Sequence, residues 1–195
     1  MTRTVIESKT KTAIIGFDQP FCVIGERINP TGRKILNEEL ERGDFSRVEA
    51  DAIAQTLAGA TVLDINSGAV FSNKMAEDPR YADNNFVEPG LMAELVKRVQ
   101  AIVDTPLCID SSVPGALENG LAAAEGRPLL NSVTGEEDRM ELVLPLVKKY
   151  NVPVVAISND DTGISEDPDV RFEVAKRIVQ RAADFGIPAH DIVVD

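Results

Sequence analysis

Pro106-Leu107-Cys108-Ile109-Asp110-Ser111 is a short apolar run that turns polar at its end. Short apolar runs rich in β-branched residues are typical of buried parallel strands. In a (β/α) barrel the carboxyl ends of the strands form the functional face, so a polar end predicts a site there. Five more runs have this form: Phe21–Arg27, Thr61–Asn66, Pro128–Ser132, Val154–Asn159 and Asp191–Asp195.

Helical periodicity separates these runs, and the clearest example places Leu91, Leu95 and Val99 on one face. Strict alternation of strands and helices implies parallel strands with right-handed crossovers. The fold class is therefore α/β. We expect a TIM-type (β/α)8 barrel, of which this chain supplies about the first six strands, because a doubly wound sheet would gather its polar ends at one switch point. Helices are expected around residues 35–42, 45–57, 91–102, 114–124, 142–147 and 170–185.

Residues 1–19 precede the first run and are expected to form an N-terminal hairpin or arm that plugs the bottom of the barrel. Residues 20–195 are expected to be the barrel domain, incomplete at its C-terminus. An eight-stranded barrel typically needs about 250 residues. We therefore expect a piece of a longer protein, and the alternative is a partial barrel completed by another chain.

The formal net charge of −12 argues against a nucleic-acid or anionic-membrane surface. No apolar stretch approaches the roughly 18 residues of a membrane helix, and the N-terminus lacks a signal-peptide core. A cytoplasmic location is the default expectation. Cys22 and Cys108 lie in apolar runs and are expected to be buried thiols, and with the single His190 they give a transition-metal site little support.

The connection from Ser67 to Val87 is long and has little periodicity. Loops of this length often act as lids or docking loops in compact domains. The alternative is a surface insertion.

The run Gly25-Glu26-Arg27-Ile28-Asn29-Pro30-Thr31-Gly32-Arg33-Lys34 resembles the opening motif of the methyltetrahydrofolate:corrinoid methyltransferases. They belong to the pterin-binding barrel family, together with dihydropteroate synthase and the folate module of cobalamin-dependent methionine synthase. Six motifs in order at barrel spacing cover residues 20–195. The five that follow are Leu63–Asn66, Cys108–Ser111, Leu130–Ser132, Ser158–Gly163 and Asp191–Asp195.

The resemblance implies that Asp110, Asn131 and Asp195 hold the edge of a pterin ring. Carboxylates accept hydrogen bonds from the ring donors, and an amide can both donate and accept. For Asp110 and Asn131 the alternative is helix capping.

Five more residues are carried over with less definite roles. Asp64 and Asn66 are candidate ring contacts or their neighbours, or else strand-end groups that satisfy loop amides. Asn29 and Arg27 are expected to line the pocket or orient its carboxylates. Asp160 is expected to contact the pterin or its tail, with an Asx-type turn as the alternative.

By the same resemblance the reaction moves the N5 methyl group of methyltetrahydrofolate to or from the cobalt of a corrinoid (cobalamin) held by a partner protein, as part of one-carbon metabolism. The corresponding enzymes are commonly homodimers. The asparagine expected near N5 would follow strand seven, beyond residue 195, so the catalytic residue is unknown and the chain alone is expected to be a doubtful catalyst.

Three alternatives remain open. A dihydropteroate synthase is disfavoured because the usual Thr-Pro-Asp-Ser-Phe-Ser signature is absent from the first-strand region. A non-catalytic folate-binding module predicts pterin binding without methyl transfer. A generic aldolase-type barrel would need a Schiff-base lysine at a strand end, and no strand run contains one.

Overall fold

The computed structural model describes residues 2–68 and 87–195, which form two sheets. The smaller sheet is an antiparallel hairpin of β1 (Thr4–Glu7) and β2 (Thr12–Ile15). The larger sheet is parallel throughout. Its six strands are β3 (Ile24–Ile28), β4 (Val62–Asn66), β5 (Leu107–Asp110), β6 (Leu129–Thr134), β7 (Val154–Ile157) and β8 (Ile192–Val194).

The six parallel strands are hydrogen-bonded in the order in which they occur along the chain, β3-β4-β5-β6-β7-β8. A doubly wound sheet reverses its strand order at a switch point, and this sheet has no reversal. The prediction of an α/β fold built as part of a (β/α) barrel is therefore confirmed.

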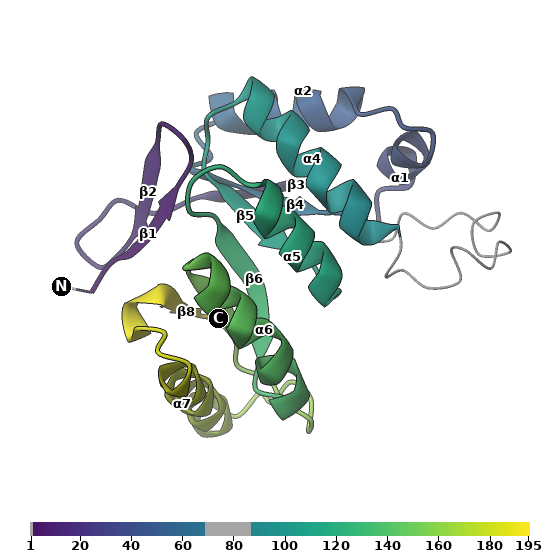
Figure 1. Ribbon diagram of the computed structural model, residues 1–195. Helices are drawn as coiled ribbons and strands as arrows, with labels where there is room; N and C mark the ends of the chain where they lie inside the picture. The colour runs from purple at the N-terminus through teal and green to yellow at the C-terminus, as the bar shows by residue number, and fades with distance from the viewer. Residues whose placement is uncertain (1, 69–86) are drawn as a thin grey trace, which may run out of the picture.

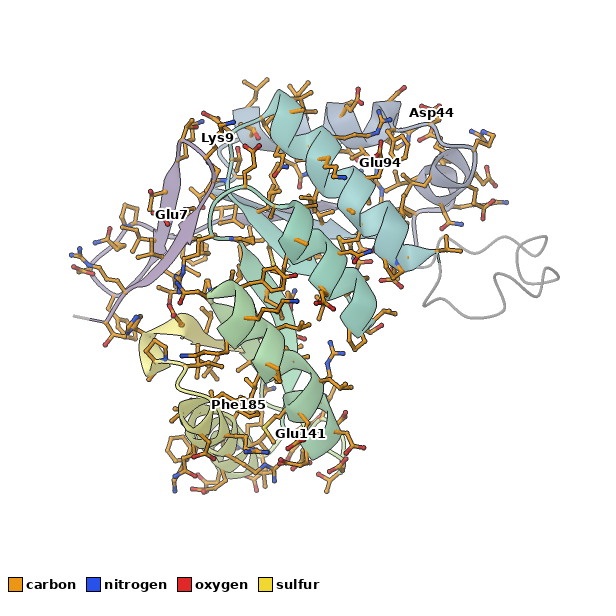
Figure 2. All side chains as sticks on the ribbon, viewed as in Figure 1. Glu7, Lys9, Asp44, Glu94, Glu141 and Phe185 are labelled. Atoms are coloured by element: carbon orange, nitrogen blue, oxygen red, sulfur yellow. The ribbon has the colours of Figure 1, made fainter. Side chains whose placement is uncertain are left out.

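The helices follow one another along the outer face of this sheet (Figure 1). Their apolar sides pack on Leu63, Ile109 and Leu130, which are fully buried. Charged side chains such as Glu94 and Glu141 lie on the outer sides of the helices (Figure 2). The helices are α1 (Lys34–Glu41), α2 (Ser46–Leu57), α4 (Glu88–Ile102), α5 (Pro114–Ala123), α6 (Glu137–Tyr150) and α7 (Pro168–Asp184), with a 3₁₀ turn η2 (Ala189–Asp191) before β8.

A second, smaller core lies on the inner face of the sheet. Val62, Cys108 and Leu129 point inward from three adjacent strands and pack against Ile6 and Ala13 of the hairpin. Because side chains alternate along a strand, the next inward residues toward the carboxyl ends are Asp64, Asp110 and Asn131. The hairpin thus covers the amino ends of the strands on the inner face, and the polar residues lie at the carboxyl ends.

Arg127, just before β6, ties the hairpin to the sheet. Its guanidinium donates to the carbonyl oxygens of Val5 at 2.6 Å and Asn151 at 2.7 Å, and it pairs with Asp191 at 2.6 Å. The Asp191 side chain is 6% exposed. Thr4 adds a hydrogen bond from its hydroxyl to the carbonyl oxygen of His190 at 2.6 Å.

Gly126 allows the hairpin to approach this closely. Its φ of +91° is left-handed, and a Cβ at this position would overlap the carbonyl oxygen of Glu7. We expect Gly126→Ala to lower the free energy of unfolding by about 2–4 kcal/mol, from backbone strain and steric overlap together. Urea unfolding measures this loss. Gly43→Ala is the control, because Gly43 has a φ of +72° but open space around its Cβ position, and an equal loss in both variants would contradict the overlap argument.

Residues 69–86, most of the long connection expected to be a lid or docking loop, lie outside the described residues. Both cysteines are free thiols, with Cys108 buried and Cys22 half-buried, and His190 lies in η2 at the end of the sheet where the strands begin. Within residues 2–68 and 87–195 no helix is long and apolar enough to cross a membrane.

Candidate functional site

Three polar residues lie side by side across the carboxyl ends of β4, β5 and β6. In the sheet register Asn66 is opposite Asp110, and Asp110 is opposite Asn131. The Nδ2 of Asn66 donates to Oδ2 of Asp110 at 2.8 Å, and Oδ1 of Asn66 accepts from the N–H of Gly68 at 2.7 Å. We call Asn66, Asp110 and Asn131 the polar row. All three residues are partly exposed.

Asp64 lies below the polar row on the same inward face and is 3% exposed. Burial, and next the charge of Asp110, raise the pKa of the Asp64 carboxyl to about 7. Contacts with Cys108 and Asn131 oppose this rise. Oδ2 of Asp64 is buried and has no hydrogen-bond partner among the described residues. At neutral pH this carboxyl can therefore either accept or donate a hydrogen bond.

The capping alternatives for Asp110 and Asn131 do not describe the structure. Helix α5 begins at Pro114, with Val113 at its N-cap, and helix α6 has Glu136 at its N-cap. The local turn is instead held by Ser111, whose Oγ accepts from the N–H of Val113 at 2.9 Å. Asp110 and Asn131 therefore do not cap the helices that follow them.

Two strand irregularities flank the polar row. The pairing of β6 with β7 shifts between Asn131 and Val133, and the pairing of β3 with β4 shifts between Gly25 and Ile28. Such bulges change the direction of side chains and are common beside functional sites.

Glu88 is an acid that the sequence did not indicate. It is 4% exposed in the first turn of α4, and its Oε1 hydrogen-bonds to the hydroxyl of Ser111. Burial raises its pKa, the bond from Ser111 opposes the rise, and the charge of Asp110 adds to it. A polar residue at the start of a helix usually indicates a solvated first turn, so periodicity gave no signal here.

Glu26, Asn29 and Arg27 belong to the first motif, and their side chains have different surroundings in the structure. Glu26 is exposed, and its charge raises the pKa values of Asp64 and Asp110, so it lies near both although it was not predicted. Asn29 joins it through a hydrogen bond from Nδ2 to Oε1 of Glu26 at 3.3 Å. Arg27 is exposed, and its backbone N–H donates at 2.9 Å to Gln55 on α2. Its predicted role at the pocket stays a prediction.

Asp160 follows β7 and Asp195 follows β8, and neither is hydrogen-bonded to the polar row. Oδ1 of Asp160 accepts from the N–H of Thr162 at 3.0 Å, which is the Asx-type turn given as the alternative, and Oδ2 pairs with Arg177 at 3.0 Å. Asp195 follows β8 and is exposed, and its carbonyl oxygen accepts from the N–H of Ser158 at 3.0 Å. Ligand contacts of both residues remain predictions.

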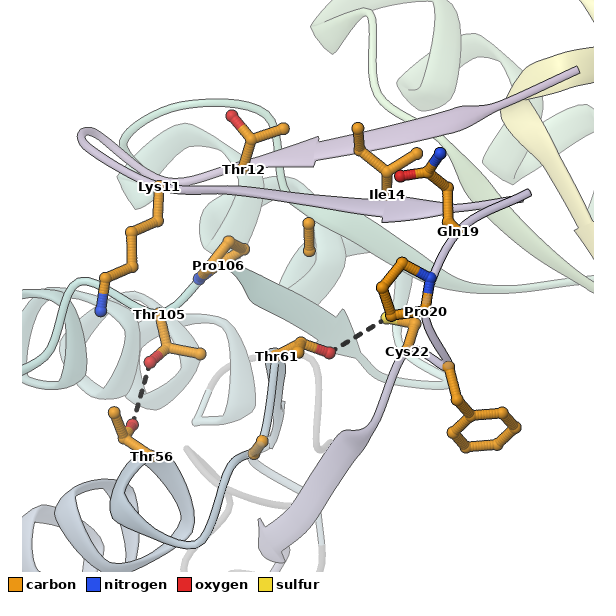
Figure 3. A pocket seen from close by; sticks show the side chains of 13 residues that line it. Lys11, Thr12, Ile14, Gln19, Pro20, Cys22, Thr56, Thr61, Thr105 and Pro106 are labelled. Atoms are coloured by element: carbon orange, nitrogen blue, oxygen red, sulfur yellow. Dashed lines mark hydrogen bonds between the residues drawn. The ribbon is translucent and has the colours of Figure 1, made fainter. Parts of the chain in front are cut away.

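A cavity of about 370 Å³ lies beneath the hairpin, at the opposite end of the strands from the polar row (Figure 3). Lys11 and Thr12 line it from the hairpin, and Thr61 and Pro106 line it from the residues just before β4 and β5. It holds none of the predicted site residues. In the part of the chain that is described, no group of three histidine, cysteine, aspartate or glutamate side chains is arranged to hold a metal ion.

Residues 25–195 match the family described as pterin binding enzyme. Among its relatives, the methylcorrinoid:tetrahydrofolate methyltransferase of Eubacterium limosum is 29% identical over 175 residues, which are 89% of this chain and 59% of that protein. The methionine synthase of Mycobacterium leprae (strain TN) is 28% identical over 195 residues, which are 96% of this chain and 15% of that protein. The chain therefore spans less than two thirds of each relative.

Solved structures support the fold. A dihydropteroate synthase of Xanthomonas albilineans with 4-aminobenzoic acid superposes with a TM-score of 0.63 at 22% identity, covering all of this chain and 65% of that one. The 7,8-dihydropteroate synthase of Vibrio fischeri ES114 gives a TM-score of 0.62 at 17% identity, covering 98% of this chain and 66% of that one. At these identities the likeness concerns the barrel and not the reaction.

Proposed function

This chain belongs to the pterin-binding enzyme family, and on that premise we propose that it binds methyltetrahydrofolate and forms the folate-binding part of a methyltetrahydrofolate:corrinoid methyltransferase. The polar row is the single observation that carries the proposal. Asn66, Asp110 and Asn131 occupy one level of three adjacent strand ends, with the buried Asp64 beneath them.

The chemistry of the row suits the edge of a pterin ring. A pterin presents a 2-amino group and ring N–H donors beside acceptor nitrogens and a carbonyl. The carboxylate of Asp110 accepts from the donors, and the amide of Asn131 can serve either kind of group. A flat heterocycle is bound well by a few convergent polar groups above apolar walls. Asp195 and Asp160 are further proposed contacts, for the ring edge and the folate tail.

In the proposed reaction the bond between N5 and the methyl carbon breaks as the methyl group passes to the cobalt of a reduced corrinoid. The leaving amine is a strong base, so a proton or hydrogen bond must reach N5 as the bond breaks. The corrinoid is a substrate on a partner protein, and it supplies the nucleophile. A homodimer and docking of the corrinoid protein through the Ser67–Val87 connection belong to the same proposal.

The names of the two relatives favour methyl transfer over pterin condensation. The dihydropteroate synthase structures match with lower identity, and the first-strand motif here lacks the Thr-Pro-Asp-Ser-Phe-Ser signature. A synthase is therefore the second candidate, because it shares the barrel.

Asp110→Asn is expected to weaken methyltetrahydrofolate binding by about 100-fold, because hydrogen bonds to a charged acceptor contribute about 1.5–3 kcal/mol each. Calorimetric titration measures the loss, with hydroxymethylpterin diphosphate as a competing ligand. Asp104→Asn is the matched control, since Asp104 pairs with Lys11 at 2.7 Å at the opposite end of the strands.

Equal affinities of Asp110→Asn and the unchanged protein would contradict the assignment of the pterin edge to this row. Tighter binding of the pterin diphosphate than of methyltetrahydrofolate would favour the synthase. Methyl transfer to a corrinoid protein, followed by the corrinoid absorption spectrum, distinguishes an enzyme from a binding module.

A further inference from the structure

Arg139 lies in the first turn of α6 and reaches the carboxyl ends of β5 and β6. Its Nη1 donates to the carbonyl oxygen of Ser112 at 2.7 Å. Its Nη2 donates to the carbonyl oxygens of Ser111 at 3.0 Å and Ser132 at 3.1 Å. One guanidinium therefore holds three backbone carbonyls from two adjacent strand ends.

Two of these carbonyls belong to the residues that directly follow members of the polar row. Ser111 follows Asp110, and Ser132 follows Asn131. The peptide unit is planar, so each fixed carbonyl oxygen fixes the peptide plane that follows Ser111 or Ser132, one residue beyond the polar row. The N–H of Ser111 donates to the carbonyl oxygen of Asn131 at 3.1 Å, which joins the two strand ends directly. Arg139 thus braces the backbone just beyond Asp110 and Asn131.

Arg139 also places a positive charge near a group of acids. Burial raises the pKa of Asp110, the hydrogen bond from Asn66 lowers it, the charge of Glu26 raises it and the charge of Arg139 lowers it. Burial lowers the pKa of Arg139 itself, but a guanidinium stays protonated under these conditions. The titratable or charged groups that face Asp110 are Glu26 on β3, Asp64 on β4, Cys108 on β5, Glu88 on α4 and Arg139 on α6.

We propose that Arg139 is a positioning residue of the pterin site, whose planar guanidinium fixes the backbone just beyond Asp110 and Asn131 and whose positive charge favours the carboxylate form of Asp110. The identity of the ligand rests on the proposed function, whereas the effect on Asp110 needs no ligand. A lysine keeps the charge but lacks the planar set of donors that reaches three carbonyls at once.

The test uses Arg139→Lys and Arg139→Gln in the full-length protein. Arg181→Gln on α7 is the matched control, because Arg181 pairs with Glu137 and Glu141 on the outer surface. Carbon-13 NMR of the aspartate carboxyl groups follows the titration of Asp110, and Asp110→Asn assigns the signal. We expect the titration to move to higher pH in Arg139→Gln and to remain near the original pH in Arg139→Lys and Arg181→Gln.

Binding provides the second readout. Methyltetrahydrofolate affinity at pH 8 is expected to fall about tenfold in both Arg139 variants, because both lose hydrogen bonds that fix the row. On acidification, the affinity of Arg139→Gln is also expected to begin to fall at a higher pH than that of the unchanged protein, because Asp110 is protonated at a higher pH. Circular dichroism of each variant checks that the fold is kept.

An Asp110 titration that is identical in Arg139→Gln and the unchanged protein would overturn the charge role. Undiminished affinity in both Arg139 variants would overturn the positioning role. If the unchanged protein does not bind methyltetrahydrofolate at all, the proposed function fails, and the NMR titration still decides whether Arg139 controls Asp110.

Discussion

Asp64→Asn is expected to make the protein more stable at pH 8, by as much as about 4 kcal/mol. The Asp64 carboxyl is buried, and its pKa is raised from 3.8 to about 7. At pH 8 the folded protein must therefore hold an unfavourable buried charge, and its Oδ2 has no hydrogen-bond partner within residues 2–68 and 87–195. An asparagine is neutral and keeps a side chain of the same shape.

The sign of the pH dependence follows from the direction of the pKa shift. Between pH 3.8 and about 7 the folded protein keeps a proton on Asp64 that the unfolded chain has lost. Stability therefore falls as the pH rises through this range and stays level above it. From pH 5 to pH 8 this group accounts for about 3 kcal/mol of the decline.

Urea unfolding of both proteins at pH 5 and pH 8 measures the effect. The variant should gain stability relative to the unchanged protein as the pH rises. Asp184→Asn, an exposed change on α7, should give the same difference from the unchanged protein at both pH values. A pH-independent difference for Asp64→Asn would show that the carboxyl is not the group that titrates. If replacing Asp64 by asparagine raises the free energy of unfolding, Asp64 is retained for function and not for stability.

Arg127→Met is expected to lower the free energy of unfolding by about 3–5 kcal/mol. The substitution leaves the Asp191 carboxylate buried without its partner and removes the donors to the carbonyls of Val5 and Asn151. Three segments lose a common contact at once: the hairpin, the turn after α6 and the residues before β8. Most of the loss comes from the uncompensated charge and not from the missing attraction.

Chemical unfolding of Arg127→Met is compared with two further variants. Arg181→Met removes ion pairs with Glu137 and Glu141 on the outer surface and should cost under about 1 kcal/mol. Combining Arg127→Met with Asp191→Asn should restore part of the stability, because the buried charge is then gone. Similar losses for Arg127→Met and Arg181→Met would contradict the role assigned to the buried pair.

The alternation of apolar runs and helical segments was sufficient to predict the six parallel strands, since each run is short, buried and bounded by turn residues. It also predicted the polar row, because Asn66, Asp110 and Asn131 each stand at the end of a run. The helix bounds were less accurate. Helix α6 begins at Glu137, before its first periodic apolar residues, because its first turn is polar.

That polar turn carries Arg139, which explains why the sequence did not reveal it. A charged residue at the start of a helix ordinarily faces solvent, and only the packing of α6 beside β6 brings Arg139 to the carbonyls of Ser111, Ser112 and Ser132. Glu88 was missed for a similar reason. Its burial depends on the contact between the start of α4 and Ser111, which follows β5, and no local pattern encodes this tertiary relation.

The hairpin docks through contacts that are far apart in the sequence, and this has a consequence for the order of folding. Thr4 bonds to His190 across 186 positions, and Arg127 bonds to Val5 across 122. By contrast, each parallel strand pairs with its immediate neighbour in chain order. Distant contacts carry a larger loop-closure entropy and form later. The sheet can therefore form one βα unit at a time. The hairpin packs against the amino ends of the strands only after the segments around Arg127 and His190 are in place.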